Sequence, residues 1–396
     1  MRVLQINSTV NTGSTGRIAE DIGRLLISLG HESFIAYGRT SRESSSQTYR
    51  IGSTLDNYSH VFVSRVFDRH GFASQKSTLE LVKYMDRIKP DVIQLHNLHG
   101  YYINLPILFN YLHRSKIPVV WFLHDCWAFT GHCTYFEYYG CYKWKIHCNK
   151  CPKLSYYPKS LWLDNSYRNF AEKKTLFSSV SNLIIVTPSD WLKNLVGESF
   201  LSEKKIVRIH NGVDLEVFKP YCHGADSHPP YVLGVANVWS ELKGFKDFLE
   251  LRNILPEEID IVLVGLPIGE LRKLPKGIRG VPRTESVQEL AQYYSQALCF
   301  INPTYEDNFP TTNIEALACG TPVITYDTGG SSEAVDSETG IVVSKGDING
   351  LAHSVNKIME KDRNYWKRNC RQRAETFFDK NKQYMKCVQL YEQMLS

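Results

Sequence analysis

The sequence predicts an α/β protein with parallel sheets, and three observations support this prediction. Short apolar runs alternate with amphipathic helical stretches along most of the chain, which is the pattern of a parallel sheet with crossover helices. The chain has 396 residues, enough for two domains. A polar stretch containing prolines, residues 219–230, separates two halves that both show this alternation, as a linker would.

The composition predicts a soluble protein that stays in the cytoplasm. A hydrophobic content of 43% and a charged content of 22% are ordinary for a globular domain. No apolar run approaches the roughly 20 residues of a membrane-spanning helix. The first ten residues, MRVLQINSTV, lack the long apolar region of a signal peptide. Ten cysteines without a secretion signal therefore indicate reduced thiols or metal ligands.

The charge is unevenly distributed between the two halves. Residues 1–210 contain 26 Lys and Arg against 16 Asp and Glu, a net charge of +10, whereas the whole chain carries +5. A basic half suits an anionic membrane surface or an anionic acceptor. A solvated basic surface without a partner would have the same composition, and the sequence leaves both interpretations open.

The first half begins with a strand, residues 1–7, and a polar loop that leads into an amphipathic helix. Gly13 and Gly16 in this loop allow a close approach of the backbone, although the full dinucleotide-binding glycine pattern is missing. Residues 40–50 are predicted to form a polar loop. Further buried strands are predicted at 34–37, 91–95, 117–123, 183–187 and 206–209. Ligands bind at the carboxyl ends of parallel strands, and His124 follows such an end.

An aromatic-rich segment, residues 126–152, follows this histidine and contains four loop cysteines. These are Cys133, Cys141, Cys148 and Cys151, the last two forming a C-x-x-C pair. Four thiolates can close a tetrahedral structural zinc site. The spacing between the two halves of the set is not a standard zinc pattern, so packed free thiols remain an equal alternative.

The second half centres on residues 302–330, NPTYEDNFPTTNIEALACGTPVITYDTGG. Apolar runs at 297–302 and 322–326 predict buried strands, and a helix is predicted between them, with Pro310 before it and Gly320 after it. Asp307 and Glu315 flank the helix start. A carboxylate accepts hydrogen bonds from two hydroxyls, and a helix start binds phosphate, so the pair suits a nucleotide-sugar. The alternative is that both acids only cap and solvate the helix.

This stretch resembles the signature of the retaining glycosyltransferases of family 4, which have the GT-B fold. EALACGTPVI and TGG match the family closely, but the first acid is Asp307 where the family has Glu. We assign the role to Asp307 and not to the adjacent Glu306, because Phe309 then falls where the family has its Phe. The resemblance implies that the first acid contacts the donor sugar and that Glu315 contacts the ribose.

The resemblance implies further site residues in both halves. Lys243, followed by Gly244, matches the cation that grips the donor diphosphate, whereas Asn237 stands where the family has a second cation, Arg. His124 matches a histidine close to the reacting sugar. The implied catalytic set is His124, Asp307, Glu315 and Lys243. The other implied donor-binding residues are Gly13, Gly16, Asn237, Val281, Asn308, Phe309, Pro310 and Thr311.

The resemblance also implies a domain organisation, with two Rossmann-like domains whose parallel sheets face each other across a cleft. An acceptor-binding domain is expected at residues 1–210, a linker at 211–230 and a nucleotide-sugar-binding domain at 231–375. Residues 376–396 are expected to form a helix that crosses back to the first domain.

The implied activity is transfer of a hexose from a UDP- or GDP-sugar to a hydroxyl of a glycan or lipid-linked glycan, with retention of configuration. Family precedent favours bacterial surface-polysaccharide synthesis on the inner face of the plasma membrane. The chain contains no Asp-x-Asp, so no catalytic cofactor is expected, and no nucleic-acid-binding motif is present. The alternatives are a GT-B epimerase or phosphorylase acting on sugar phosphates, and a non-catalytic binder of anionic glycans.

Overall fold

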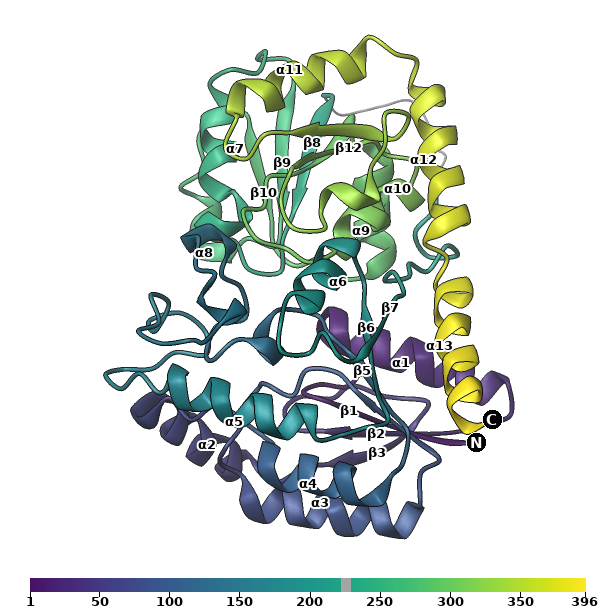
Figure 1. The fold of residues 1–396 in the computed structure, drawn as a ribbon. Helices are drawn as coiled ribbons and strands as arrows, with labels where there is room; N and C mark the ends of the chain where they lie inside the picture. The colour runs from purple at the N-terminus through teal and green to yellow at the C-terminus, as the bar shows by residue number, and fades with distance from the viewer. Residues whose placement is uncertain (222–228) are drawn as a thin grey trace. The chain divides into compact units, whose positions relative to one another are not determined.

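A computed structural model describes residues 1–221 and 229–396, so the expected linker at 211–230 lies partly outside the described residues. The chain forms two compact units (Figure 1). Unit 1 comprises Met1–Ile209 together with Tyr384–Ser396, and unit 2 comprises His210–Gln383. None of the helices in the described ranges is both long and apolar enough to cross a membrane.

Unit 1 is built on a seven-stranded sheet in the order β3-β2-β1-β4-β5-β6-β7, with every neighbouring pair parallel. Its strands are β1 (Arg2–Asn7), β2 (Glu32–Tyr37), β3 (Gln47–Arg50), β4 (Val92–Leu95), β5 (Val119–Phe122), β6 (Leu183–Thr187) and β7 (Lys205–Arg208). Its helices are α1 (Gly13–Ser28), α2 (Thr54–Phe67), α3 (Gln75–Ile88), α4 (Leu105–Ser115), α5 (Ser166–Ser178), α6 (Asp190–Gly197) and most of α13 (Lys380–Leu395). Three short 3-10 helices, Trp127–Phe129, Glu137–Tyr139 and Lys143–Lys145, lie in the cysteine-containing segment.

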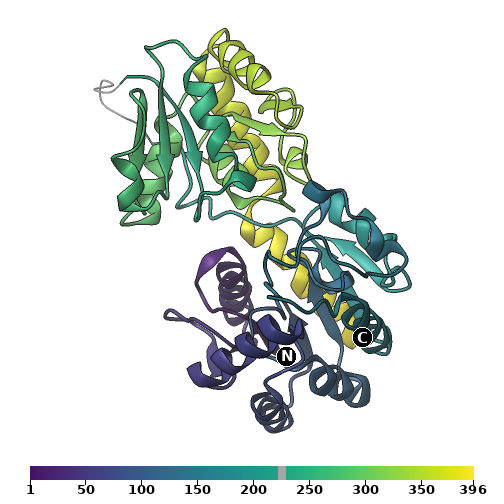
Figure 2. The same ribbon diagram turned by 90° about the vertical axis from the view of Figure 1, so that its left-hand side faces the viewer.

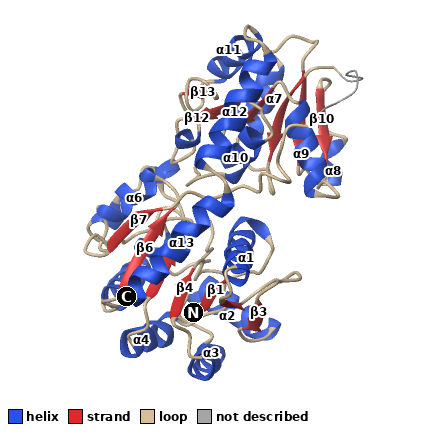
Figure 3. Ribbon diagram, turned by 90° about the vertical axis from the view of Figure 1, so that its right-hand side faces the viewer, coloured by secondary structure: helices blue, strands red, loops and turns tan. Residues whose placement is uncertain are grey.

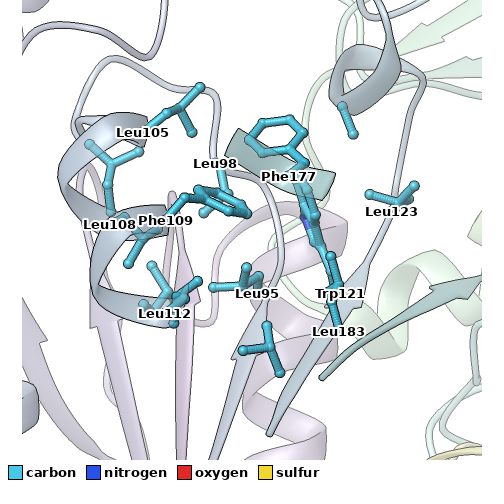
Figure 4. Close-up of a cluster of buried hydrophobic side chains, with 14 of the residues drawn as sticks. Leu95, Leu98, Leu105, Leu108, Phe109, Leu112, Trp121, Leu123, Phe177 and Leu183 are labelled. Atoms are coloured by element: carbon cyan, nitrogen blue, oxygen red, sulfur yellow. The ribbon is translucent and has the colours of Figure 1, made fainter. Parts of the chain in front are cut away.

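Both faces of this sheet are buried, because successive residues of a strand point to opposite faces. On one face, Leu95 and Trp121 pack with Leu108 and Phe109 of α4 and with Phe177 of α5 (Figure 4). The opposite face is covered by α1 and by α13, and Figure 3 shows α13 beside β6. The members of this second cluster include Val3, Val92, Val120, Val186, Ile22, Tyr384, Val388 and Tyr391. The last helix of the chain therefore completes the core of unit 1.

The prediction of a polar loop over residues 40–50 is wrong in part, because residues 47–50 form the edge strand β3. This strand pairs in parallel with β2, from Phe34 opposite Gln47 to Tyr37 opposite Arg50. Its sequence, QTYR, is polar and mostly exposed, so it lacks the apolar run that identified the other strands. Backbone pairing with β2, and not burial of its side chains, places it in the sheet.

Unit 2 is built on a six-stranded parallel sheet in the order β10-β9-β8-β11-β12-β13. Its strands are β8 (Tyr231–Val235), β9 (Asp260–Val264), β10 (Ile278–Val281), β11 (Cys299–Asn302), β12 (Val323–Tyr326) and β13 (Gly340–Val343). Its helices are α7 (Phe245–Arg252), α8 (Ile268–Leu271), α9 (Val287–Gln296), α10 (Thr311–Ala318), α11 (Ile348–Met359) and α12 (Arg363–Phe377), with short 3-10 helices at Glu241–Lys243 and Ser332–Ala334. The two parallel sheets confirm the predicted α/β fold class.

Helices cover both faces of this second sheet, as Figure 2 shows for the green and yellow part of the chain. Leu233 and Phe300 pack on one face with residues of α9, α10 and α12, whereas Val232 and Ile301 pack on the other with α7 and α11. The strand order reverses between β8 and β11, which leaves a crevice at their carboxyl ends where open α/β sheets bind ligands. A ligand site in unit 2 is therefore expected at the loops that follow β8 and β11.

Candidate active site

The loops after β8 and β11 contact each other directly. Gly244 has a φ of +71°, and a Cβ atom there would lie 2.4 Å from the carbonyl oxygen of Pro303. Tyr305 N–H donates to the carbonyl of Leu242 at 2.9 Å. Only glycine combines this positive φ with this close approach, so the Lys-Gly pair of the sequence is what brings the two loops together.

This contact places Lys243 against Asp307. Lys243 Nζ lies 2.6 Å from Asp307 Oδ2, and the two side chains are 38% and 17% exposed. The second carboxylate oxygen of Asp307 accepts from Asn308 N–H at 2.9 Å. A Cβ atom on Gly329 would lie 1.8 Å from the carbonyl oxygen of Asp307. The TGG turn therefore packs directly against the backbone of the loop that carries Asp307. The structure thus joins the predicted diphosphate cation and the predicted first acid in one accessible ion pair.

Glu315, the second predicted acid, lies on the buried side of α10. Its residue is 6% exposed, and its Oε2 accepts from Tyr294 O–H at 3.2 Å. Within the described residues no side chain caps the start of α10, which follows Pro310. The first N–H groups of that helix, beginning at the half-buried Thr311, remain suited to an anionic oxygen. Tyr294 was not predicted as a site residue, because α9 and α10 are apart in the sequence.

Phe309 and Asn308 are buried and shape the loop. Phe309 is 3% exposed and stacks on His210, with ring centroids 4.7 Å apart. Asn211 Nδ2 donates to the carbonyl of Phe309 at 3.0 Å. His210 and Asn211 were not predicted as site residues. These contacts fix the backbone before Pro310, and so fix the start of α10.

The two remaining predicted donor-binding residues of unit 2 lie at strand ends. Asn237 follows β8 and is exposed, and Val281 is the last residue of β10 and is half-buried. Gly265 N–H donates to the carbonyl of Val281 at 2.9 Å. An amide at position 237 cannot neutralise a phosphate, so Lys243 and the start of α10 supply the positive charge that this part of unit 2 offers.

In unit 1, Gly13 and Gly16 belong to the first turn of α1, directly after β1. Gly13 has a φ of +67°, and a Cβ atom on Gly16 would lie 2.7 Å from Thr9 Oγ1 and 3.2 Å from Asn11 N. Asn11 N–H donates to the carbonyl of Gly16 at 3.0 Å. The loop is therefore tightly wound on glycines at the carboxyl end of β1.

His124 ends β5 and belongs to a buried polar network. Its Nε2 lies 3.0 Å from Nδ1 of His96, whose own Nε2 lies 3.0 Å from Gln5 Oε1 and 3.1 Å from Gln94 Nε2. Tyr391 of α13 donates its hydroxyl to Gln94. Burial lowers the pKa of His124 to about 4, against the opposing effect of Asp125. The imidazole is therefore neutral near pH 7, with its orientation fixed by His96.

A second polar pair beside this histidine was not predicted. His99 Nε2 lies 2.6 Å from Asp125 Oδ2, and His99 Nδ1 lies 3.0 Å from Tyr157 Oη. Asp125 Oδ1 accepts from Trp127 N–H at 2.9 Å. The hydrogen bond to Trp127 and the neighbouring His99 keep the pKa of Asp125 below its ordinary value although burial alone would raise it. Both residues follow neighbouring strand ends, which is the signal that would have identified them.

Four of the five cysteines in the aromatic-rich segment, Cys133, Cys141, Cys148 and Cys151, line one small cavity in unit 1 together with His132. None of the nine cysteines among the described residues forms a disulfide. Across residues 1–221 and 229–396, no three His, Cys, Asp or Glu side chains are already placed around one point to hold a metal ion. The predicted zinc site is thus not formed as a closed tetrahedron, although its sulfur atoms share one cavity.

Comparisons with known proteins agree with this architecture. A model of Glycosyltransferase Family 4 matches residues 15–217, and a model of the glycosyl transferases group 1 matches residues 229–361. WcaC of Escherichia coli strain K12, provisionally described as a colanic acid biosynthesis glycosyl transferase, is 24% identical over 370 residues, covering 88% of each chain.

Solved structures show the same fold. The sucrose-phosphate synthase of Thermosynechococcus elongatus superposes with a TM-score of 0.71 at 17% identity, covering 99% of this chain and 98% of that one. HepE of Anabaena in complex with UDP-glucose gives 0.64 at 14% identity, covering 98% and 99%. With a GT-B fold and a family model that spans just over half of its residues, the chain belongs to Glycosyltransferase Family 4, the retaining glycosyltransferases that use nucleotide-sugars.

Proposed function

We propose that this enzyme transfers a hexose from a UDP- or GDP-sugar to a hydroxyl of a glycan or lipid-linked glycan, in the synthesis of a bacterial surface polysaccharide. The observation that carries the proposal is the accessible ion pair between Lys243 and Asp307 next to the start of α10. The similarity to WcaC over 88% of the chain supports a role in polysaccharide synthesis.

The proposed division of labour follows from the charges. The Lys243 ammonium and the first N–H groups of α10 hold the diphosphate and stabilise the negative charge that develops as the bond from the sugar to the phosphate breaks. Asp307 accepts hydrogen bonds from sugar hydroxyls once its partner lysine turns to the phosphate. Glu315 accepts from the ribose. Catalysis in this proposal needs no metal, because lysine and backbone amides supply the positive charge.

His124 is proposed to contact the reacting sugar. As a neutral imidazole held by His96 at 3.0 Å, it offers a fixed polar atom at the carboxyl end of β5. A contact that is stronger in the transition state than in the bound substrate raises the turnover rate and leaves nucleotide affinity unchanged. This role is separate from those of Lys243 and Glu315, which are proposed to bind the nucleotide part.

We infer that the enzyme works in the cytoplasm, attached to an anionic membrane surface through unit 1. One face of α2 exposes Leu55, Tyr58 and Phe62, which are 77%, 68% and 62% exposed. The adjoining loop exposes Trp162 at 76%. Leu161 N–H donates to the carbonyl of Arg65 at 2.7 Å, which joins the loop to the end of α2. Aromatic side chains suit the interface of a bilayer, and the net charge of +10 over residues 1–210 suits its anionic headgroups.

The donor is tested with a thermal-shift panel of UDP- and GDP-sugars, because a ligand that binds only the folded state raises the melting temperature. The donor that raises it is then incubated with lipid-linked glycans, and the product and the released nucleotide are quantified. The proposal predicts nucleotide release that depends on the acceptor. Free sugar released without an acceptor, or turnover that requires inorganic phosphate, would contradict it and favour an epimerase or a phosphorylase.

A further inference from the structure

We propose that the cavity lined by Cys133, Cys141, Cys148 and Cys151 in unit 1 is a structural zinc site, in which the four sulfurs bind one Zn²⁺ as thiolates. All four cysteines face this one small cavity, although they are spread over 19 residues of irregular chain. Zinc prefers a tetrahedral set of cysteine sulfurs in structural sites of this kind. The site is outside the residues proposed for sugar transfer, and it does not depend on their roles.

The backbone is shaped to bring these sulfurs together. Lys150, between the two cysteines of the C-x-x-C pair, has a φ of +45°, a conformation that a lysine rarely adopts. Gly131 N–H donates to Cys148 Sγ at 3.2 Å. A Cβ atom on Gly131 would lie 2.8 Å from Cys148 Cβ and 2.2 Å from the carbonyl oxygen of Ser166, so only glycine fits there. The turn at Lys150 and the close approach at Gly131 therefore fix the position of Cys148 beside the cavity.

Two buried nitrogen atoms on residues lining the same cavity lack a partner. His132 Nε2 and Trp144 Nε1 are both fully enclosed and have no hydrogen-bond partner among residues 1–221 and 229–396, and both residues are at most 2% exposed. His132 Nδ1 lies 2.5 Å from Asp68 Oδ1, which fixes the ring. Buried polar groups are nearly always satisfied, so an unpartnered pair at one cavity needs an explanation. A metal-bound thiolate would supply the missing acceptor for the Trp144 N–H.

A buried cation beside the sulfurs points the same way. Lys173 of α5 is 1% exposed, and its ammonium donates to the carbonyls of Trp127 and Thr130 at 2.8 and 3.1 Å. The ammonium also lies 3.4 Å from the centre of the Trp127 ring, and within the described ranges no carboxylate forms a salt bridge with it. Burying an ammonium without a counter-charge is costly. A zinc ion with four thiolates carries a net charge of −2, which would supply that counter-charge to Lys173, whereas His132 is already paired with Asp68.

We place His132 next to the sulfurs and not among the ligands, because the four cysteine sulfurs already complete a tetrahedral ligand set. Binding converts four thiols to thiolates and releases four protons, with no change of oxidation state. The metal would then tie together the segment 126–152, which begins directly after Asp125. Because Asp125 accepts from Trp127 N–H, zinc binding would hold the carboxyl end of β5 in place from the other side.

The test is elemental analysis of the full chain, purified without chelators under reducing conditions. The proposal predicts one zinc per chain, and four thiols that react with a mercurial reagent as one zinc is released from the folded protein. Cobalt-substituted protein should show the thiolate charge-transfer bands and the d–d bands of a tetrahedral site. A full complement of reactive thiols with no zinc, after growth in zinc-supplemented medium, would overturn the proposal.

Variants assign the ligands. Cys148→Ser and Cys141→Ser should each lose the metal, whereas Cys126→Ser, a buried cysteine of the same segment that does not line the cavity, should keep it. His132→Gln should keep one zinc but bind it roughly 10- to 100-fold more weakly, as expected for a group that supports the ligands. Zinc retained in Cys141→Ser and lost in His132→Gln would replace the four-thiolate set with three cysteines and a histidine. If a cysteine variant fails to fold, the thiol titration of the wild-type protein still shows whether four thiols hold one zinc.

Discussion

The two units share a parallel α/β architecture but place different chemistry at their strand ends. In unit 2 the loops after β8 and β11 carry charged groups, with Lys243 and Asp307 joined as an accessible ion pair. In unit 1 the ends of β4 and β5 carry buried histidines, and His124 is neutral because burial lowers its pKa to about 4. An anionic nucleotide needs charge, whereas a reacting sugar needs a dry and fixed polar atom. This difference is the basis of the proposal that unit 2 binds the nucleotide and that unit 1 supports the reacting sugar.

The largest effect is expected from Lys243→Ala. Loss of the cation beside the leaving diphosphate should lower kcat/KM by roughly 100- to 1,000-fold, the range measured when one preorganised donor to a developing charge is removed. Steady-state kinetics with the identified donor checks this. Lys246→Ala is the matched control, since Lys246 is exposed and pairs with Glu241. Equal kcat/KM values for the two variants would contradict the proposal that Lys243 binds the donor diphosphate.

His124→Ala should lower kcat by roughly 100-fold, because a preorganised polar contact to the reacting sugar is lost. The Kd for the nucleoside diphosphate, measured by calorimetry, should stay unchanged. His113→Ala, an exposed histidine of the same unit, serves as the control. If the His124→Ala variant binds nucleotide poorly but has a normal kcat, His124 contributes to nucleotide binding. The proposed difference in role between the two units would then be wrong.

Glu315→Gln should weaken nucleotide-sugar binding by roughly 10- to 100-fold, because a hydrogen bond to a charged group contributes about 1.5–3 kcal/mol. Tyr294→Phe, which removes the O–H that donates to Glu315 at 3.2 Å, should have a smaller effect in the same direction. Calorimetry on both variants checks this, with the exposed Glu338→Gln as the control. If Glu315→Gln leaves the affinity for the nucleotide-sugar unchanged, Glu315 has only a structural role in α10.

Trp162→Ser should weaken binding to anionic vesicles by roughly tenfold, since burying a large apolar side chain contributes about 1.5–3 kcal/mol. The matched control is Ile268→Ser in unit 2, because both side chains are 76% exposed. Sedimentation with vesicles of anionic and of neutral lipid measures the effect, and added salt should release the wild type from the anionic ones. Equal loss in both variants would show that attachment is not specific to unit 1.

The last expected effect is confined to acid conditions and concerns stability. Burial lowers the pKa of His60 in unit 1 from its ordinary value of 6.5 to about 3. The stability that the neutral ring contributes is complete above pH 6.5 and is lost as the pH falls towards 3, at about 1.4 kcal/mol per pH unit. Pulse proteolysis in urea, with fragments mapped to each unit, should show a shallower pH dependence of unit 1 in His60→Gln than in the wild type. His113→Gln should match the wild type, and a slope unchanged in His60→Gln would contradict the prediction.

The sequence showed more of the candidate site of unit 2 in a single stretch than of the candidate site of unit 1. Asp307, Pro310 and Glu315 lie within nine residues, so one stretch of sequence showed the acids, the helix start and the turn together. The partners of His124 come from β1, β4 and α13, and only folding brings Gln5, His96 and Tyr391 together. The exposed edge strand β3 was missed for a related reason, because its place is fixed by pairing with β2 and leaves no apolar pattern in its sequence.

The position of α13 has a consequence for how the protein is made. Tyr384, Val388 and Tyr391 fill one face of the sheet of unit 1, yet they follow all of unit 2 in the chain. At roughly 5–20 residues per second of synthesis, the ribosome needs about 10–35 s to pass from the end of β7 to this helix. During that interval the nascent sheet lacks the contacts that this helix makes in the cluster with Val92, Val120 and Val186. Unit 1 therefore completes its core only after unit 2 has been synthesised, whereas unit 2 is formed from one continuous segment.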